Sequence, residues 1–347
     1  MYDRILLIKT GALGDVLRTT SILPGLRALE GSGSIVWVTS PGAEPLVRDH
    51  PLLDDVRTWD GDPEGVDACF ASLGSKGHEW ILSLDDERGP CRLATRLGAN
   101  SGSRLSGAYE DASGELAYTD DMEAWFGMGL LSRWGKPEAD KRKRENELSH
   151  GRIFAGMLGI EDSKPSLVLP GALVEQAREN LGGRGVLIGL NTGAGGRWSS
   201  KGLSVERSVE LAALLHDALG SNVRFAVLGG ALEAERNRRM VERLGAVEDL
   251  AVVDGGTENG ILEFAAQVAC CDVLISSDSM ALHMGVALER PVVAFFAPTS
   301  GAEVDLFGHG RSIRSTSSDY CSYRPDADNS SITPERLCSA VLELLNE

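Results

Sequence analysis

Four short segments combine glycines with polar side chains that could do chemistry, and each follows a run that is typical of a buried strand. The first is Gly11-Ala12-Leu13-Gly14-Asp15. Its glycines allow a tight turn and a close approach of the backbone to a substrate. Asp15 is placed to begin a helix and could accept a proton from a hydroxyl substrate. A carboxylate there is also an ordinary helix cap, so this segment alone leaves both roles open.

The second segment runs from Asn191 to Lys201 and combines glycines and hydroxyls with two cations, Arg197 and Lys201. Backbone N–H groups and cationic side chains together suit phosphate oxygens. The order of residues is not that of a Walker loop, because Gly-Lys-Ser/Thr is absent. The alternative is a surface loop with Trp198 packed on the core.

The third segment, from Ser276 to His283, predicts a strand that runs directly into a helix. The first N–H groups of such a helix, with its dipole, form an anion site, and Asp278 or Ser279 is expected to cap it. His283 is either a packing residue or a base. In the fourth segment, Glu233 follows two glycines and could bind ribose hydroxyls, although helix-dipole stabilisation of an exposed acid explains it equally well.

The elements that must position these segments alternate between strand and helix, which predicts an α/β fold with doubly wound sheets. We expect an N-terminal Rossmann-like domain over residues 1–165, a C-terminal one over 166–330, and a final helix over 331–347 that packs back toward the first domain. Residues 111–147, which include the basic run from Lys141 to Arg144, predict an irregular excursion, and Pro24 is expected to kink or split the first helix. Expected strands are 4–9, 34–40, 79–85, 185–191, 223–230, 250–256, 272–278 and 291–298; expected helices are 16–29, 208–219, 233–244, 261–271, 280–288 and 333–345.

Composition narrows the classes of function. The hydrophobic fraction of 42% supports packed cores, and the formal net charge of −17 opposes binding to nucleic acids or anionic lipids. No apolar run approaches the roughly 20 residues that span a bilayer, so we expect a cytoplasmic protein. The six cysteines form no C-x-x-C pair, which argues against a structural metal, and Cys321 with Cys338 is the one disulfide pairing kept open.

Taken together, the four segments resemble glycosyltransferase family 9, the ADP-heptose:lipopolysaccharide heptosyltransferases. The matching stretches are IKTGALGDVLRTTSILPGLR, GLNTGAGGRW with the lysine that follows, VLGGALEAE and LISSDSMALHMGVALERPVVAFFAPTS. The resemblance implies the GT-B architecture, in which two Rossmann-like domains face a central cleft. It also implies inverting, metal-independent transfer of a heptose from ADP-heptose to a lipopolysaccharide-type acceptor, with no cofactor. No nucleic-acid partner is expected, and peripheral membrane contact through the acceptor stays open.

The resemblance also assigns roles to individual residues. Asp15 resembles the general base and Lys201 the cation that neutralises the donor diphosphate, while Thr10, Gly11 and Arg18 are candidates for acceptor contact. The residues assigned to the donor are Gly14, Thr192, Gly193, Arg197, Lys201, Glu233, Asp278, Ser279, Met280, Ala281 and His283.

Three departures from the family pattern bear on the sugar: Met280 and Ala297 each replace a usual glycine, and the loop Thr10-Gly11-Ala12 has fewer hydroxyls than is typical of the family. Alternatives are therefore kept. One is a transferase of the same fold that uses another nucleotide sugar, or a protein or natural-product acceptor. Another is a sugar-nucleotide epimerase of the same fold. A non-catalytic nucleotide-binding protein is the alternative from another class, against which the joint presence of Asp15, Lys201 and Asp278 argues.

Overall fold

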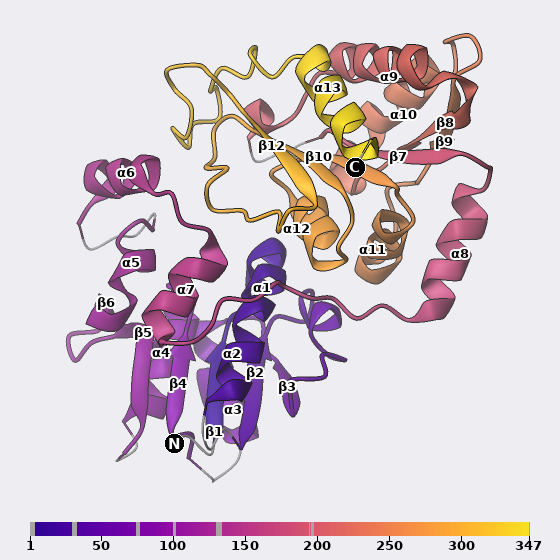
Figure 1. Ribbon diagram of the computed structural model, residues 1–347. Coiled ribbons are helices and arrows are strands. Elements are labelled where there is room, and N and C mark those ends of the chain that lie inside the picture. The colour runs from indigo at the N-terminus through magenta and orange to yellow at the C-terminus, as the bar shows by residue number, and fades with distance from the viewer. Residues whose placement is uncertain are drawn as a thin grey trace. The chain divides into compact units, whose positions relative to one another are not determined.

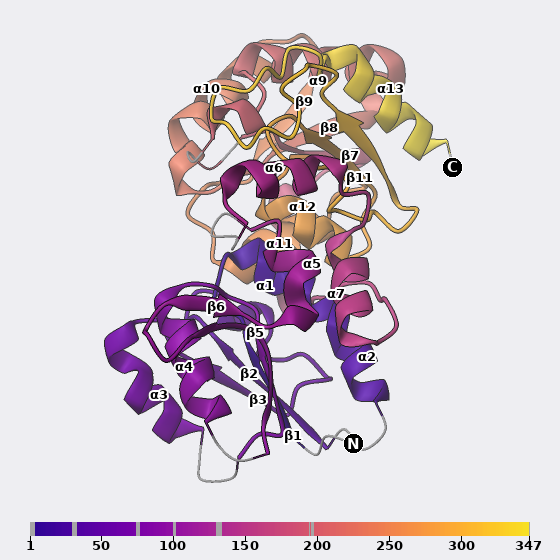
Figure 2. The same ribbon diagram turned by 90° about the vertical axis from the view of Figure 1, so that its left-hand side faces the viewer.

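The computed structural model describes residues 4–29, 33–73, 77–99, 102–129, 134–193, 195 and 198–346. The chain divides into two compact units, Met1–Val168 and Leu169–Glu347. Each unit contains one six-stranded sheet with helices against its faces (Figures 1 and 2). This confirms the predicted α/β class with two Rossmann-like units.

The sheet of the first unit has the strand order β3-β2-β1-β4-β5-β6. All neighbouring strands are parallel except the pair β5 and β6. The central strand β1 is buried from Ile5 to Ile8, which explains its unbroken apolar run. The strands are β1 Arg4–Ile8, β2 Ser34–Thr39, β3 Asp55–Thr58, β4 Trp80–Ser83, β5 Arg104–Glu110 and β6 Leu116–Tyr118.

The sheet of the second unit has the order β12-β11-β10-β7-β8-β9, and all its neighbouring strands are parallel. In each sheet the chain winds outward on one side and then crosses to the other. The crossing leaves β1 beside β4 in one unit and β7 beside β10 in the other, and open α/β sheets bind ligands at such switch points. The strands are β7 Val186–Asn191, β8 Val223–Val227, β9 Ala251–Asp254, β10 Val273–Ser277, β11 Val292–Phe296 and β12 Gly310–Arg314.

The helices of the first unit confirm the predicted interruption near Pro24. A 3₁₀ turn, η1 (Thr20–Ile22), separates α1 (Leu13–Thr19) from α2 (Leu23–Ala28), and Pro24 lies in the first turn of α2, where no intrahelical N–H donor is required. The other helices of this unit are α3 Val66–Ser72, α4 Arg88–Gly98, α5 Glu123–Phe126, α6 Lys136–Glu145 and α7 His150–Leu158.

The helices of the second unit follow their strands closely. The C-terminal helix α13 begins after Thr333, whose side chain accepts a hydrogen bond from the backbone N–H of Arg336, as a cap does. Its buried Leu337 and Val341 belong to the core of the second unit, and the expectation that this helix packs toward the first domain stays a prediction. The helices are α8 Gly171–Leu181, α9 Val205–Leu219, α10 Ala234–Leu244, α11 Ile261–Ala269, α12 Met280–Ala287 and α13 Pro334–Leu345.

The excursion predicted over residues 111–147 is more regular than expected, because it contains β6, α5 and α6. The basic run lies on α6, where Lys143 is buried while Lys141 and Arg144 are exposed. The pairing left open between Cys321 and Cys338 is not formed, since all six cysteines are free thiols. No helix in the described part of the chain is long and apolar enough to cross a membrane.

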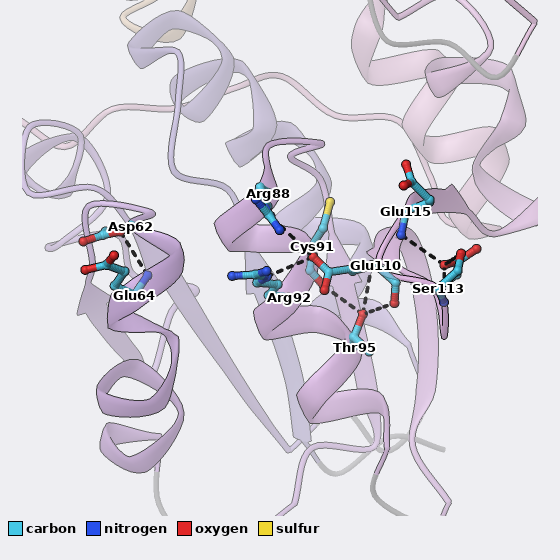
Figure 3. A network of polar contacts seen from close by, with 10 residues as sticks. Asp62, Glu64, Arg88, Cys91, Arg92, Thr95, Glu110, Ser113 and Glu115 are labelled. Carbon is cyan, nitrogen blue, oxygen red and sulfur yellow. Dashed lines mark hydrogen bonds and ion pairs between the residues drawn. The ribbon is translucent and has the colours of Figure 1, made fainter.

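Helix α4 is fixed to β5 by side chains, as Figure 3 shows. The Thr95 hydroxyl donates to the backbone oxygen of Glu110 at 2.7 Å and accepts from the Glu110 N–H at 2.9 Å. The Glu110 carboxylate accepts from Arg92 Nε at 2.9 Å. Helix α4 therefore cannot shift along β5 without breaking these bonds, which stabilises the connection from β4 into the helix.

Candidate functional site

In the second unit, the loop after β7 and the connection after β10 are joined by hydrogen bonds at the switch point. The Asn191 amide donates to the hydroxyls of Ser276 at 3.2 Å and Ser279 at 2.9 Å. The Ser277 hydroxyl donates to the backbone oxygen of Gly193 at 2.6 Å. The second and third candidate segments, which are about 80 residues apart in sequence, therefore form one site, as their position after adjacent strands predicts.

Lys201 and Asp278 form the ion pair of this site. Lys201 ends the short 3₁₀ helix η5 (Ser199–Lys201), and its ammonium donates to Asp278 Oδ2 at 2.9 Å and to the Asp278 backbone oxygen at 3.0 Å. The two side chains remain 21% and 18% exposed, respectively. Burial alone raises the pKa of the Asp278 carboxyl. The charges of Lys201 and His283 lower that pKa and outweigh burial, so it lies below its ordinary value. The Asp278 carboxyl is therefore ionised at neutral pH, and both side chains of the pair are partly exposed.

Helix α12 begins directly after this ion pair, with Ser279 at the N-cap position. Its hydroxyl makes no capping bond to the helix, because it pairs with Asn191 and with the Ser276 hydroxyl at 3.1 Å. The prediction that Asp278 or Ser279 caps the helix is thus confirmed for the position of Ser279. It is wrong about the capping hydrogen bond, which the Ser279 side chain does not make. The first-turn N–H groups at Met280 and Ala281 lack that side-chain cap, as an anion-binding helix end requires.

Glu233 connects two glycine loops. It ends the 3₁₀ helix η7 (Ala231–Glu233), and its two carboxylate oxygens accept from the backbone N–H groups of Gly195 at 3.2 Å and Gly230 at 2.9 Å. A Cβ on Gly193 would lie 1.9 Å from Glu233 Oε1, so that glycine leaves room for the carboxylate. Each carboxylate oxygen retains a lone pair for a further donor.

Arg236 is a functional candidate that the sequence analysis missed. Its guanidinium donates to the Thr192 hydroxyl at 2.7 Å, the Leu203 backbone oxygen at 3.1 Å and the Ser208 hydroxyl at 3.3 Å. Burial lowers the pKa of this arginine, and the Glu233 charge partly offsets the shift. Helix α10 carries many charges, but the spacing is a signal that could have found Arg236, since it lies one turn before Met240 and two before Leu244, both buried.

The remaining donor candidates have simpler surroundings. His283 is buried on α12, close enough for its charge to act on Asp278. Arg197 lies outside the described residues. In the described part of the chain, no group of three or more His, Cys, Asp and Glu side chains is arranged to hold a metal ion.

In the first unit, Asp15 lies in the first turn of α1. The N-cap residue is Ala12, so Asp15 is the third residue of the helix, not its cap. Its carboxylate pairs with Arg18 at 2.9 Å and is 36% exposed. The Arg18 guanidinium lies 5.1 Å from the ring centroid of Trp125 on α5, which holds this partner in place.

The turn before α1 carries the other candidates for acceptor contact. Gly11 is not among the glycines with a positive φ, and its peptide bond to Ala12 is cis. A Cβ at Gly11 would meet no atom within 4 Å, so the turn faces open space. The Thr10 hydroxyl donates to Asp85 Oδ2 at 2.7 Å. Gly14 is the second residue of α1.

Removal of the Arg236 side chain should destabilise the second unit. Arg236→Ala loses the hydrogen bonds to Thr192, Leu203 and Ser208 and a further one to the Asn237 side chain, so we expect the unfolding free energy to fall by about 1–3 kcal/mol. Arg238→Ala, on the same helix, removes an exposed arginine paired with Glu235 and Glu242 and is the matched control. Urea denaturation of both variants measures the difference; equal midpoints would contradict an anchoring role for Arg236.

Comparison with known proteins places this geometry in a family. The sequence pattern of glycosyltransferase family 9 (heptosyltransferase) matches residues 154–328, half of the chain. A Haemophilus influenzae protein provisionally named a glycosyltransferase is 29% identical over 309 residues, covering 85% of this chain and 82% of its own length. Lipopolysaccharide heptosyltransferase 1 of Escherichia coli O18:K1:H7 is 24% identical over 327 residues, covering 89% and 90%.

A solved structure has the same fold across nearly the whole chain. A glycosyltransferase family 9 protein of Veillonella parvula superposes with a TM-score of 0.76 at 19% identity, covering 99% of this chain and 97% of that one. Its fold agrees with the two Rossmann-like units, and the family pattern covers the loop with Lys201 and the connection with Asp278. The chain therefore belongs to glycosyltransferase family 9, the heptosyltransferase family.

Proposed function

We propose that this transferase moves a sugar, with a heptose from ADP-heptose as the first candidate, to a hydroxyl group of a lipopolysaccharide core or related glycan. The transfer inverts the anomeric carbon and uses no metal ion. The observation that carries the proposal is the Lys201–Asp278 pair at the start of α12, at the switch point of the second sheet. Family membership and the names of the Escherichia coli relatives support the choice of sugar.

The second unit is suited to hold the donor diphosphate. Lys201 is the one lysine between residues 169 and 347, and its ammonium lies beside the first turn of α12. An ammonium and a helix N-terminus both stabilise the negative charge that develops on a departing nucleoside diphosphate. Asp278 keeps the ammonium in place before the donor arrives, and Glu233 is available to accept ribose hydroxyls.

The first unit supplies a base for the acceptor. Asp15 is partly exposed and its carboxylate is oriented by Arg18. A sugar hydroxyl becomes acidic only as it attacks, so its base requires hydrogen-bonding reach more than a shifted pKa. Transfer requires the acceptor oxygen to reach both Asp15 and the anomeric carbon of the bound donor. The acceptor hydrogen then passes to the carboxylate as the bond to the diphosphate breaks.

A screen of nucleotide sugars in excess EDTA tests this function. ADP-linked heptose should bind and be transferred, and UDP- and GDP-linked sugars should do so more weakly. Activity should persist in EDTA, because Lys201 provides the charge that a metal provides in other transferases. Donor consumed to give an isomer without acceptor would identify an epimerase, while binding without turnover would identify a non-catalytic protein. A metal requirement restored by Mg²⁺ or Mn²⁺ would also overturn the proposal.

Lys201→Ala should weaken donor binding and slow transfer, with a loss of roughly 2–4 kcal/mol of transition-state stabilisation, as for removal of one preorganised charged group. Arg324→Ala is the control, because it removes an exposed cation paired with Asp326 while its backbone oxygen still accepts from the Ser200 hydroxyl. Donor titration and single-turnover kinetics separate the two variants. Wild-type kinetics in Lys201→Ala would contradict the proposed contact between Lys201 and the donor diphosphate.

Asp15→Asn should leave donor affinity near normal and lower turnover by roughly 10²–10⁴-fold, because the amide cannot take the acceptor proton. Melting should change little, since a partly exposed ion pair contributes about 0–1 kcal/mol. Asp67→Asn is the control: Asp67 is a first-turn acid of α3 that also pairs with an arginine, Arg96. Turnover within a few-fold of wild type would exclude Asp15 as the base and make His283 the next candidate.

A further inference from the structure

Asp85 is a buried carboxylate that follows β4 at the switch point of the first sheet. Within the described residues it accepts three hydrogen bonds from the end of β1. These come from the Lys9 ammonium, the Thr10 backbone N–H and the Thr10 hydroxyl, the last at 2.7 Å. One side chain therefore fixes two consecutive residues at the beginning of the turn that leads to Asp15.

The charge of Lys9 strengthens this attachment. Burial alone lowers the pKa of the Lys9 ammonium, but the nearby carboxylates of Asp85 and then Asp15 raise it above its ordinary value. Lys9 is therefore charged at neutral pH, and its bond to Asp85 is a charge-assisted one with little exposure to water. The effect of Asp15 on Lys9 also shows that these two side chains are within electrostatic reach of each other.

The backbone at Asp85 is held by the sheet and by helix α4. Strand β4 lies between β1 and β5, and the Cys91 Sγ on α4 lies 3.8 Å from the Asp85 backbone oxygen. Figure 3 shows Cys91 in the network that fixes α4 to β5 through Thr95 and Glu110. The adjacent acid, Asp86, accepts instead from the Tyr118 hydroxyl at 3.1 Å. In the described part of the chain, it is Asp85 whose carboxylate accepts from Lys9 and Thr10.

We propose that Asp85 is a positioning residue for Asp15: it holds the turn from Lys9 to Ala12, and thereby the first turn of α1, where the Asp15 carboxylate can meet the acceptor hydroxyl. This inference rests on the proposed role of Asp15 as base. It assigns Asp85 no contact with substrate. Small displacements of a base from its reacting oxygen reduce rate strongly, which gives an anchor of this kind a kinetic effect.

A purely structural Asp85 makes a different prediction, because it stabilises the unit without acting through Asp15. Asp54 provides a comparison. It accepts from the Ile35 backbone N–H at 2.7 Å and from the Arg27 guanidinium, at the amino ends of the strands and on a more exposed side chain. Asp54→Asn should therefore lower the melting temperature while leaving the transfer rate constant unchanged.

The test is a double-mutant cycle with Asp85→Asn, Asp15→Asn and their combination, measured by single-turnover transfer, donor titration and melting. Asp85→Asn should lower the rate constant by roughly 10–100-fold with donor affinity within about 2-fold. In the Asp15→Asn background it should have no further effect on rate, because the group it positions is gone. A rate near wild type, or rate losses that multiply in the double variant, would overturn the proposal.

Thr10→Val keeps the test decisive where Asp85→Asn folds poorly, since it removes one hydroxyl donor and leaves the ion pair intact. We expect a smaller rate loss of roughly 3–10-fold, with a normal melting temperature and the same absence of effect in the Asp15→Asn background. A full rate in Thr10→Val would count against the anchor. Wild-type turnover in Asp15→Asn alone would instead refute the proposed base, so the two failures are distinguishable.

Discussion

A lysine and an aspartate pair at the switch point of each sheet, and the candidate residues of each unit are arranged around its own ion pair. Lys9 directly follows β1 and meets Asp85 after β4, while Lys201 follows β7 and meets Asp278 after β10. In both units the lysine follows the first strand, and the aspartate follows the neighbouring strand that the chain forms after it crosses to the other side of the sheet. Doubly wound topology brings these chain segments together, and opposite charges then join them.

The two pairs differ in their exposure to water, and that difference separates their roles. Lys9 and Asp85 are 11% and 2% exposed, whereas Lys201 and Asp278 are 21% and 18% exposed. A buried pair whose members satisfy each other acts as a fixed point, because removal of one partner leaves a costly buried charge. In a partly exposed pair, the lysine can also contact an anion that binds from solvent. On the roles proposed above, the same chemistry serves as an anchor in one unit and as a ligand contact in the other.

The sequence predicted the parts of the fold that depend on long apolar runs. Strands such as β1 and β10 are buried on both faces, so their composition alone indicates a central parallel strand. The short strands β3 and β12 were missed because half-buried and exposed residues dominate them and leave no apolar run. Helices α5 and α6 were read as irregular because glycines and charges, with little apolar periodicity, surround them.

Lys201, Glu233 and Asp278 are candidates because they belong to recognisable segments; the structure joins Lys201 to Asp278, and the roles of all three stay predictions. The sequence analysis did not single out Asp85, whose contacts arise from pairing across the sheet. It also passed over Arg236, although the spacing to Met240 and Leu244 places it on the inward face of α10. The three donors to Asp85 come from residues about 75 positions earlier, a contact that no local pattern encodes.

The two residues that replace a usual glycine of the family, Met280 and Ala297, lie in different surroundings. Ala297 is 1% exposed and belongs to the apolar core of the second unit, so its methyl group fills space among buried neighbours. Met280 is the first residue of α12, is only partly buried, and comes two residues after Asp278. On the proposed function, it is therefore Met280, at the start of the helix that follows the Lys201–Asp278 pair, that bears on which donor is accepted.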